Sequence, residues 1–158
     1  MARGPRYFVP FRRRRDGKTD YYARTRLVVS EHPRMVVRRT GRHVIAQLVV
    51  AGMDGDRTLV AASSAELRGR GYTGSLSNTP AAYLTGMLCG VRAVRGGYDC
   101  AVLDIGLHRA TVGARVFAAL RGAVEAGLDI AHDEAILPDA ARLLGEHIAA
   151  YSAEKAGI

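Results

Sequence analysis

The stretch that decides the fold is RMVVRRTGRHVIAQLVVAGMDGDRTLVAAS, residues 34–63. It holds three apolar runs that are rich in β-branched residues, as strands are. Two turn signals separate the runs, Gly41-Arg42 and Asp54-Gly55. The stretch therefore predicts two hairpins and three antiparallel strands, and its middle run is apolar on both faces, as a central strand is. We expect these strands at residues 34–40, 43–51 and 57–63.

Downstream of this stretch, helical patterns enclose one further strand. Asn78 or Thr79 can cap a helix with Pro80 in its first turn. The apolar run CAVLDIG, residues 100–106, predicts a short buried strand, and two more helical stripes follow it. The apolar stripes of the three helices are Leu84, Met87, Leu88, Val91 and Val94, then Val112, Val116, Leu120 and Val124, and finally Leu144, Ile148 and Tyr151.

The resulting order of elements, β-β-β-α-β-α-α, predicts an α/β (α+β) fold. We expect a mixed sheet of three antiparallel strands plus one further strand, covered by helices. The glycine-rich residues 64–78 show no sustained period and predict a long loop. Cys89 and Cys100 are too few for a disulfide framework, and we interpret both as small core residues.

The N-terminal residues differ from the rest of the chain. Residues 1–18 lack any period and contain two prolines, so they predict an extended basic arm in front of a single globular domain, residues 19–158. Thr19 is expected to cap a short helix with Asp20 in its first turn, and Pro33 ends that helix at the latest.

Positive charge is concentrated in this N-terminal part. Residues 1–42 hold 13 of the 23 Lys and Arg against three acids, which gives +10, whereas residues 43–158 have a net charge of −2. Of the 23 basic residues, 21 are arginine, whose planar guanidinium suits phosphate, although a GC-rich genome also favours arginine codons. The asymmetry indicates an arm for nucleic acid or an anionic membrane on a nearly neutral body.

Aromatic residues favour RNA as the polyanion. Five of the ten aromatics fall in the first 22 residues, between the basic side chains. RNA offers unstacked bases to aromatic rings and arginine planes, whereas a lipid surface does not. Two alternatives stay open at this stage: a solvated tail whose aromatics pack on the body, and a membrane-surface protein with a basic arm. The aromatics are Tyr7, Phe8, Phe11, Tyr21 and Tyr22.

Charged residues at strand ends give further candidates. Arg38 and Arg39 are adjacent, so they point to opposite faces of their strand, and one of them must face the helices or lie at an edge. We expect RNA contacts from Arg42 and at least one of this pair. The turn after LDIG, residues 103–106, suggests an alternative function as a nucleotide- or phosphate-handling enzyme. Asp104 is instead expected to accept backbone or arginine hydrogen bonds there.

Several stretches together resemble the archaeal and eukaryotic type of the eighteenth large-subunit ribosomal protein family. They are NTPAAYLTGMLCGVRA (78–93), AVLDIGLHRATVGARVFAALRGAVEAGL (101–128), GRHVIAQLVV (41–50) and RRRRDGKTDYYARTRLVV (12–29). The likeness covers nearly the whole chain, although residues 66–77 depart from the lysine-rich pattern of the family.

This resemblance implies a structural protein, not an enzyme. It implies binding to 5S ribosomal RNA, contacts with the large-subunit ribosomal RNA in the central protuberance, and the fifth large-subunit ribosomal protein as a partner. We expect a cytoplasmic, ribosomal location, because the N-terminus lacks the apolar stretch of a secretory signal. No small-molecule substrate and no membrane partner are expected.

The candidate RNA contacts combine the basic arm, the first hairpin and the turn after LDIG. His108, Arg109 and Arg115 fit phosphate contacts, although Arg115 could equally be a surface residue or the partner of Asp104. The histidines lack metal-ligand spacing and no catalytic constellation is present, so we expect no metal, no cofactor and no catalytic residue. The candidates are Arg12, Arg13, Arg14, Arg15, Lys18, Tyr21, Tyr22, Arg24, Arg26, Arg38, Arg39, Arg42, His108, Arg109 and Arg115.

Overall fold

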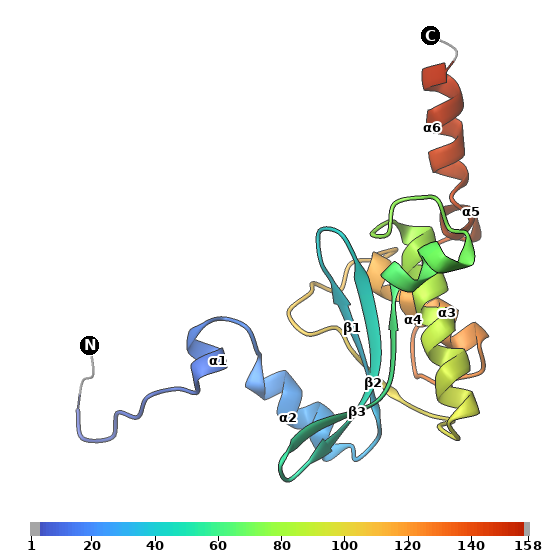
Figure 1. The fold of residues 1–158 in the computed structure, drawn as a ribbon. Coiled ribbons are helices and arrows are strands. Elements are labelled where there is room, and N and C mark those ends of the chain that lie inside the picture. Colours follow the sequence, from blue (N-terminus) through green and yellow to red (C-terminus); the bar gives the residue numbers. More distant parts are fainter. Residues whose placement is uncertain (1–3, 157–158) are drawn as a thin grey trace.

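A four-stranded mixed sheet organises the molecule (Figure 1). The computed structural model describes residues 4–156, so the first three residues of the predicted arm and the last two of the predicted domain lie outside it. The strand order is β3-β2-β1-β4, with β1 parallel to β4 and the other pairs antiparallel, which confirms the predicted α/β architecture. The strands are β1 (Arg34–Arg39), β2 (Val44–Gly52), β3 (Gly55–Ser63) and β4 (Val102–Asp104).

The two hairpins form as predicted, but with shifted turns. The first turn occupies four residues, 40–43, and the hydroxyl of Thr40 closes it by accepting the His43 backbone N–H at 2.9 Å. The second turn has Met53 and Asp54 between paired Gly52 and Gly55, one residue earlier than expected. β4 is also shorter than the predicted residues 100–106, because Cys100 lies outside it in an isolated bridge.

Helices α3 (Thr79–Arg95) and α4 (Arg115–Glu125) cover one face of the sheet. Asn78 caps α3 as predicted, since its side chain accepts the Ala81 N–H. The core forms between this helical layer and the strand residues that face it, and burial of their apolar surface is the main stabilising contribution. The largest buried side chains on the sheet side are Met35, Val37, Val44 and Leu48, and those of α4 include Val116, Phe117 and Leu120.

Glycines let α3 and α4 pack closely. A Cβ atom on Gly86 would lie 1.9 Å from the carbonyl oxygen of Ala119, and one on Gly122 would lie 2.2 Å from that of Tyr83. Both distances are far below van der Waals contact, so the two helix backbones touch where only glycine fits. This contact fixes α4 against α3 in the helical layer.

The residues between β3 and α3 are more ordered than the sequence suggested. The predicted loop 64–78 begins with η1 (Ser64–Arg70), a 3₁₀ helix. Ser63 and Glu66 form a capping box at its start, with the Ser63 backbone N–H donating to the Glu66 carboxylate at 2.9 Å. That carboxylate also pairs with Arg92 of α3. The expectation of a long loop over all of residues 64–78 was wrong for Ser64–Arg70, because these local partners offset the missing apolar period.

The C-terminal apolar stripe does not enter the core. Instead of one helix, η2 (Glu134–Ile136), α5 (Ala140–Leu144) and α6 (Glu146–Ala156) follow α4, with a left-handed Gly145 between the last two. Leu144, Ile148 and Tyr151 are exposed, and α6 extends away from the sheet (Figure 1). Periodicity alone did not reveal that these three side chains would be exposed.

Three smaller expectations about the core also fail. Val94, at the end of the apolar stripe predicted for α3, is exposed. Val112 is exposed, because it precedes α4 and is not part of its apolar stripe. Cys100 is exposed beside His32, whereas Cys89 is fully buried as predicted. Burial raises the pKa of the Cys89 thiol to about 11, so this cysteine stays a neutral core residue.

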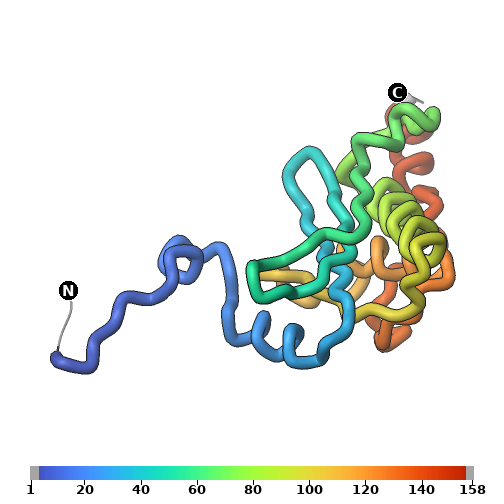
Figure 2. The backbone as a smooth tube through the Cα atoms, turned by 60° about the horizontal axis from the view of Figure 1, so that its bottom comes forward, coloured from blue at the N-terminus to red at the C-terminus, as the bar shows by residue number. Residues whose placement is uncertain are grey.

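The N-terminal part projects from the body (Figures 1 and 2). One helical turn, α1 (Arg12–Arg15), interrupts the arm that was expected to be extended throughout. α2 (Tyr21–Val29) follows, and its cap is Asp20, not Thr19, because the Asp20 carboxylate accepts the N–H groups of Tyr22 and Ala23. Neither helix contains a buried residue.

Candidate nucleic-acid interface

The face of the sheet opposite α3 and α4 is open and partly covered by α2. Strand alternation places Met35 and Val37 in the core, so Arg34, Val36 and Arg38 lie on the open face. A cleft of about 790 Å³ lies between this face and α2. Its polar lining comes from the arm, the strands and the turn after β4. The basic residues among them are Arg13, Lys18, Arg24, Arg34, Arg38 and Arg39, with His108.

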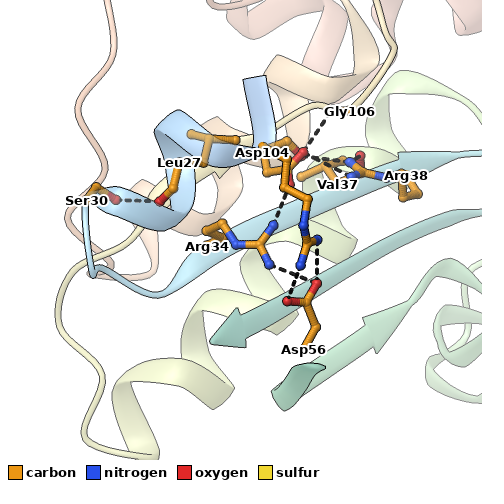
Figure 3. A network of polar contacts seen from close by, with 9 residues as sticks. Leu27, Ser30, Arg34, Val37, Arg38, Asp56, Asp104 and Gly106 are labelled. Carbon is orange, nitrogen blue, oxygen red and sulfur yellow. Dashed lines mark hydrogen bonds and ion pairs between the residues drawn. The ribbon is translucent and has the colours of Figure 1, made fainter. Parts of the chain in front are cut away.

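An ion-pair network crosses the floor of this cleft (Figure 3). The side chain of Arg34 is only 2% exposed, and its guanidinium lies between two carboxylates, 2.9 Å from Asp56 and 3.1 Å from Asp104. A buried guanidinium needs such partners, since an unpaired charge in the interior is very costly. The network therefore ties β1 to β3 through Asp56 and to the end of β4 through Asp104.

Arg38 completes the network on the side of the turn after β4. Its guanidinium donates to the Asp104 carboxylate at 3.0 Å and to the Asp104 carbonyl at 2.9 Å. The same carboxylate accepts the backbone N–H of Gly106 at 2.8 Å, where a positive φ and the closeness of Arg38 favour glycine. The predicted role of Asp104 is confirmed. Its partners are Arg34 and Arg38, so the open alternative that paired it with Arg115 is wrong.

A bidentate ion pair links α2 to the sheet. Both terminal nitrogens of Arg24 donate to the Asp56 carboxylate at 2.7 Å, from the helix to the strand. Hydrogen bonding to Arg24 is the main reason that the pKa of Asp56 falls to about 2, with Arg34 acting in the same direction. Although α2 buries no residue, this pair ties it to the body.

The predicted site residues of the arm are exposed and follow one another along α1 and α2. Tyr21 packs on Phe11 of the arm, with the ring centroids 5.1 Å apart, whereas Arg26 lies over the exposed Tyr22 ring at 4.4 Å. Tyr21 therefore joins the arm to α2, and Tyr22 is the ring that faces solvent. Arg12, Arg14 and Arg15 form no ion pair among residues 4–156, while Arg13 donates to Thr19 and Lys18 lies 3.7 Å from Asp16.

A second cavity, of about 330 Å³, lies at the end of β1 beside the N-terminus of α4. It brings together predicted candidates from distant parts of the sequence, namely Arg39 of β1, Arg115 of α4, and His108 with Arg109 from the connecting loop. One of Arg38 and Arg39 was expected to face the helices or to lie at an edge. Arg39 has the same strand parity as Met35 and Val37 and lines this cavity at the end of β1, and it also lines the cleft under α2. Arg42 lies outside both cavities, exposed in the first hairpin turn.

His108 links the two cavities. Its Nε2 accepts the backbone N–H of Arg39 at 3.3 Å, and its side chain lines both spaces. Burial, together with Arg39, Arg38 and Arg115, lowers the pKa of His108 below its ordinary value. The imidazole is therefore held as a neutral acceptor in a positively charged environment.

Sequence reasoning missed three residues of these sites. Arg34 and Asp56 were not identified, because an arginine at a strand start and an aspartate near a turn are ordinary surface residues until the fold joins them. Arg142 of α5 lines the second cavity, and its sequence neighbourhood gives no signal of that role. The alternation of side chains along a strand could have placed Arg34 on the face opposite the core and indicated that it needs an acidic partner.

Other kinds of site are absent from the part of the chain that the structure describes. No helix within residues 4–156 is both long and apolar enough to cross a bilayer. Over the same residues, no group of three or more His, Cys, Asp or Glu side chains is arranged as metal ligands would be.

The family model and the individual relatives that match this chain all point to the same family. The family model described as "Ribosomal large subunit proteins 60S L5, and 50S L18" matches residues 5–98 and 95–133. The large ribosomal subunit protein uL18 of Methanospirillum hungatei is 68% identical over 157 residues, covering 99% of this chain and 90% of its own length. The same-named protein of Methanoregula boonei is 67% identical with the same coverage. That of Halobacterium salinarum is 53% identical over 152 residues, 96% of this chain and 83% of its own.

Proposed function

The chain belongs to the family of ribosomal large subunit proteins 60S L5 and 50S L18, and from this premise we propose that it binds 5S ribosomal RNA. In the proposed role it is a structural constituent of the large subunit, without catalytic activity. It helps to attach the 5S RNA to the large-subunit ribosomal RNA in the central protuberance of cytoplasmic ribosomes. The fifth large-subunit ribosomal protein is the proposed protein partner on the same RNA.

The observation that carries this proposal is the distribution of unpaired arginines. Among residues 4–156, the carboxylates near the open face, Asp56 and Asp104, are already engaged by Arg24, Arg34 and Arg38. The arginines of α1 and those around the second cavity have no such acid, so their positive charge is free to meet phosphate. Of the predicted contacts, we therefore favour these over Arg24 and Arg38.

In this proposal the arm supplies the long-range electrostatic attraction to RNA. It buries no residue in α1, so little apolar surface offsets the entropy of ordering it in the free protein. In the proposed complex its arginines neutralise phosphates, and the exposed Tyr22 ring, with Arg26 above it, is available to stack on a base. Deletion of residues 1–18 should then weaken RNA binding without removing the thermal unfolding transition of the body.

The test is a gel shift with 5S RNA and an unrelated structured RNA over a series of salt concentrations. We expect a preference for 5S RNA and a log–log slope on the order of −4 to −7, since each neutralised phosphate contributes about −0.9 or somewhat less. Equal affinity for the two RNAs at every salt concentration would refute specific recognition. Loss of the body's thermal transition on deletion of residues 1–18 would refute the separation of arm and domain.

The enzyme alternative receives no support from the site. The Asp104 carboxylate is buried and accepts from Arg34, Arg38 and the Gly106 N–H, so it is engaged in holding the fold together. The relatives are named as ribosomal proteins. Calorimetry with a nucleotide and Mg²⁺ should accordingly give no binding heat, and a saturable heat that Asp104→Asn removes would revive the alternative.

A further inference from the structure

We propose that the cavity at the end of β1 is a built pocket for one backbone phosphate of RNA, separate from the contacts of the arm. The identification of the ligand as RNA rests on the proposed function. The binding of a phosphate group is inferred from the residues of the cavity alone. The cavity is lined by three segments distant in sequence: the end of β1, the loop that leads into α4, and α5. The lining residues with polar side chains are Arg39, Thr79, His108, Arg109, Thr111, Arg115 and Arg142.

The charge of this lining is entirely positive. Four arginines and one histidine surround about 330 Å³, and no aspartate or glutamate is among the lining residues. None of the four arginines forms an ion pair with any residue in the range 4–156. Such a concentration of like charge opposes folding unless an anion neutralises it, and guanidinium groups hold phosphate through paired N–H donors.

The surroundings indicate that this charge is uncompensated. Burial, and then the nearby Arg39, lower the pKa of Arg115 from its ordinary value. Arg39 and Arg115 act in the same direction on His108. Elsewhere in the molecule the arginines with resolved shifts, Arg24 and Arg92, have a raised pKa because a carboxylate bonds to each. The cavity therefore lacks the carboxylate that pairs with Arg24 and with Arg92.

Two of the lining side chains, Arg115 and His108, are held in place before any ligand arrives. Arg115 donates a hydrogen bond to the Ser77 carbonyl, which anchors its guanidinium in the wall. His108 is held by the Arg39 N–H at 3.3 Å. The first residues of α4 line the same space, and no side chain caps this helix, so its N-terminal dipole adds to the arginine field. Preorganised donors lose little entropy on binding, which favours a defined phosphate position.

An RNA phosphate fits this cavity better than a small free anion would. Three of its arginines, Arg39, Arg109 and Arg142, are exposed, so the cavity opens to the surface where a long polyanion can enter. Arg39 also lines the cleft beneath α2, so the cleft and the cavity share a basic residue and lie next to each other. A single RNA backbone can therefore pass from the cleft to the cavity.

The first test uses inorganic phosphate as the probe and needs no RNA. Nuclear magnetic resonance of the full chain, titrated with phosphate at constant ionic strength, should show saturable shifts at the Arg115 and Val116 amides and at the His108 ring. The pKa of His108 should rise as the anion binds, because a nearby negative charge favours the imidazolium. In the double variant Arg109→Gln/Arg142→Gln these shifts should become weak and non-saturable.

A matched control separates this effect from a general loss of positive charge. Arg95 in the last turn of α3 is exposed, forms no ion pair among residues 4–156 and lies outside the cavity. Arg95→Gln should leave the phosphate titration unchanged. Shifts that never saturate in the unaltered protein, or that survive in Arg109→Gln/Arg142→Gln, would overturn the site.

The second test asks whether the occupant is RNA. Binding to 5S RNA is measured against salt concentration for Arg109→Gln/Arg142→Gln and for Arg95→Gln. Loss of one phosphate contact should make the log–log slope shallower by about 0.7–0.9 in the double variant only. An unchanged slope beside a saturable phosphate titration would assign the site to a free anion and contradict the proposal. If the protein fails to prefer 5S RNA but the slope still changes, the proposed function fails while the phosphate site stands.

Discussion

Arg38 and Arg39 are neighbours in one strand and both line the cleft beneath α2, but their partners differ. Arg38 points to the open face, where its guanidinium binds the carboxylate and the carbonyl of Asp104. Arg39 points to the opposite face, at the strand end, into a cavity lined by three other arginines and no acid. Two arginines that are indistinguishable in the sequence thus belong to two different regions, an ion-pair network and an unpaired basic cavity.

The difference shows that the role of each arginine depends on whether a carboxylate lies close enough to pair with it. The network contains three arginines and two aspartates, and burial of Arg34 makes it part of the folded structure. Removing one member of a buried pair leaves the other charge unsolvated, whereas removing an exposed unpaired arginine does not. The network should therefore matter for stability and the cavity for binding, and the following changes test that separation.

The largest effect on stability is expected from Arg34→Met. This change leaves Asp104 buried with only Arg38 beside it and removes one partner of Asp56. Breaking a buried pair in this way costs about 3–5 kcal/mol, measured as the free energy of unfolding in denaturant. Arg39→Gln is the matched comparison, and an exposed site should change that free energy by less than about 0.5 kcal/mol. Similar losses in both variants would erase the distinction between the two regions.

An intermediate effect is expected from Asp56→Asn, and it should depend on pH. The folded state lowers the pKa of Asp56 from 3.8 to about 2, so the ionised form contributes stability above 3.8 and that contribution is lost as the pH falls towards 2. At neutral pH the variant should be less stable by about 1–3 kcal/mol, since charged hydrogen bonds to Arg24 and Arg34 are weakened.

Denaturant unfolding of both proteins over a pH series measures this contribution. The difference between the unaltered protein and Asp56→Asn should shrink as the pH falls through the interval from 3.8 to about 2. A difference that stays constant through this interval would show that the carboxylate charge of Asp56 contributes nothing.

The smallest effect is expected from His108 in the cavity. Its folded pKa is lowered, so the unfolded chain takes up the proton first, and stability should decline as the pH falls through the ordinary histidine value of 6.5. The protonated ring also cannot accept the Arg39 N–H. His108→Gln should remove this decline, which amounts to less than about 1 kcal/mol for one such hydrogen bond. Thermal unfolding above and below that pH measures it, and an unchanged decline in the variant would exclude His108 as its source.

Much of the fold could be predicted, because its determinants are local. The apolar runs of residues 34–63 and their turn signals specify the three-stranded meander, and Asn78 with Pro80 specifies the start of α3. Asp104 was also correctly expected to accept arginine or backbone hydrogen bonds, since a polar residue at a strand end needs partners. Each of these inferences depends on residues close together in the sequence.

The remaining features depend on contacts that no local pattern contains. The stripe Leu144, Ile148 and Tyr151 has helical spacing, yet all three side chains are exposed. The ion pairs of Arg34 and Asp56, and the place of Arg142 beside β1, arise only when the sheet and α5 assemble. Periodicity predicts that a helix is amphipathic, but it does not predict which neighbour its apolar face meets.

The distinction between a structural Arg38 and an RNA-binding Arg39 is tested most directly by the salt dependence of 5S RNA binding. It is measured for Arg38→Gln and Arg39→Gln at a temperature where both variants are folded. We expect Arg39→Gln to make the log–log slope shallower by about 0.7–0.9, as for one lost phosphate contact, with little change in stability. Arg38→Gln should lower the unfolding temperature and leave the slope unchanged, because Asp104 already pairs with that guanidinium. A shallower slope in Arg38→Gln together with an unchanged slope in Arg39→Gln would contradict this assignment of the two arginines.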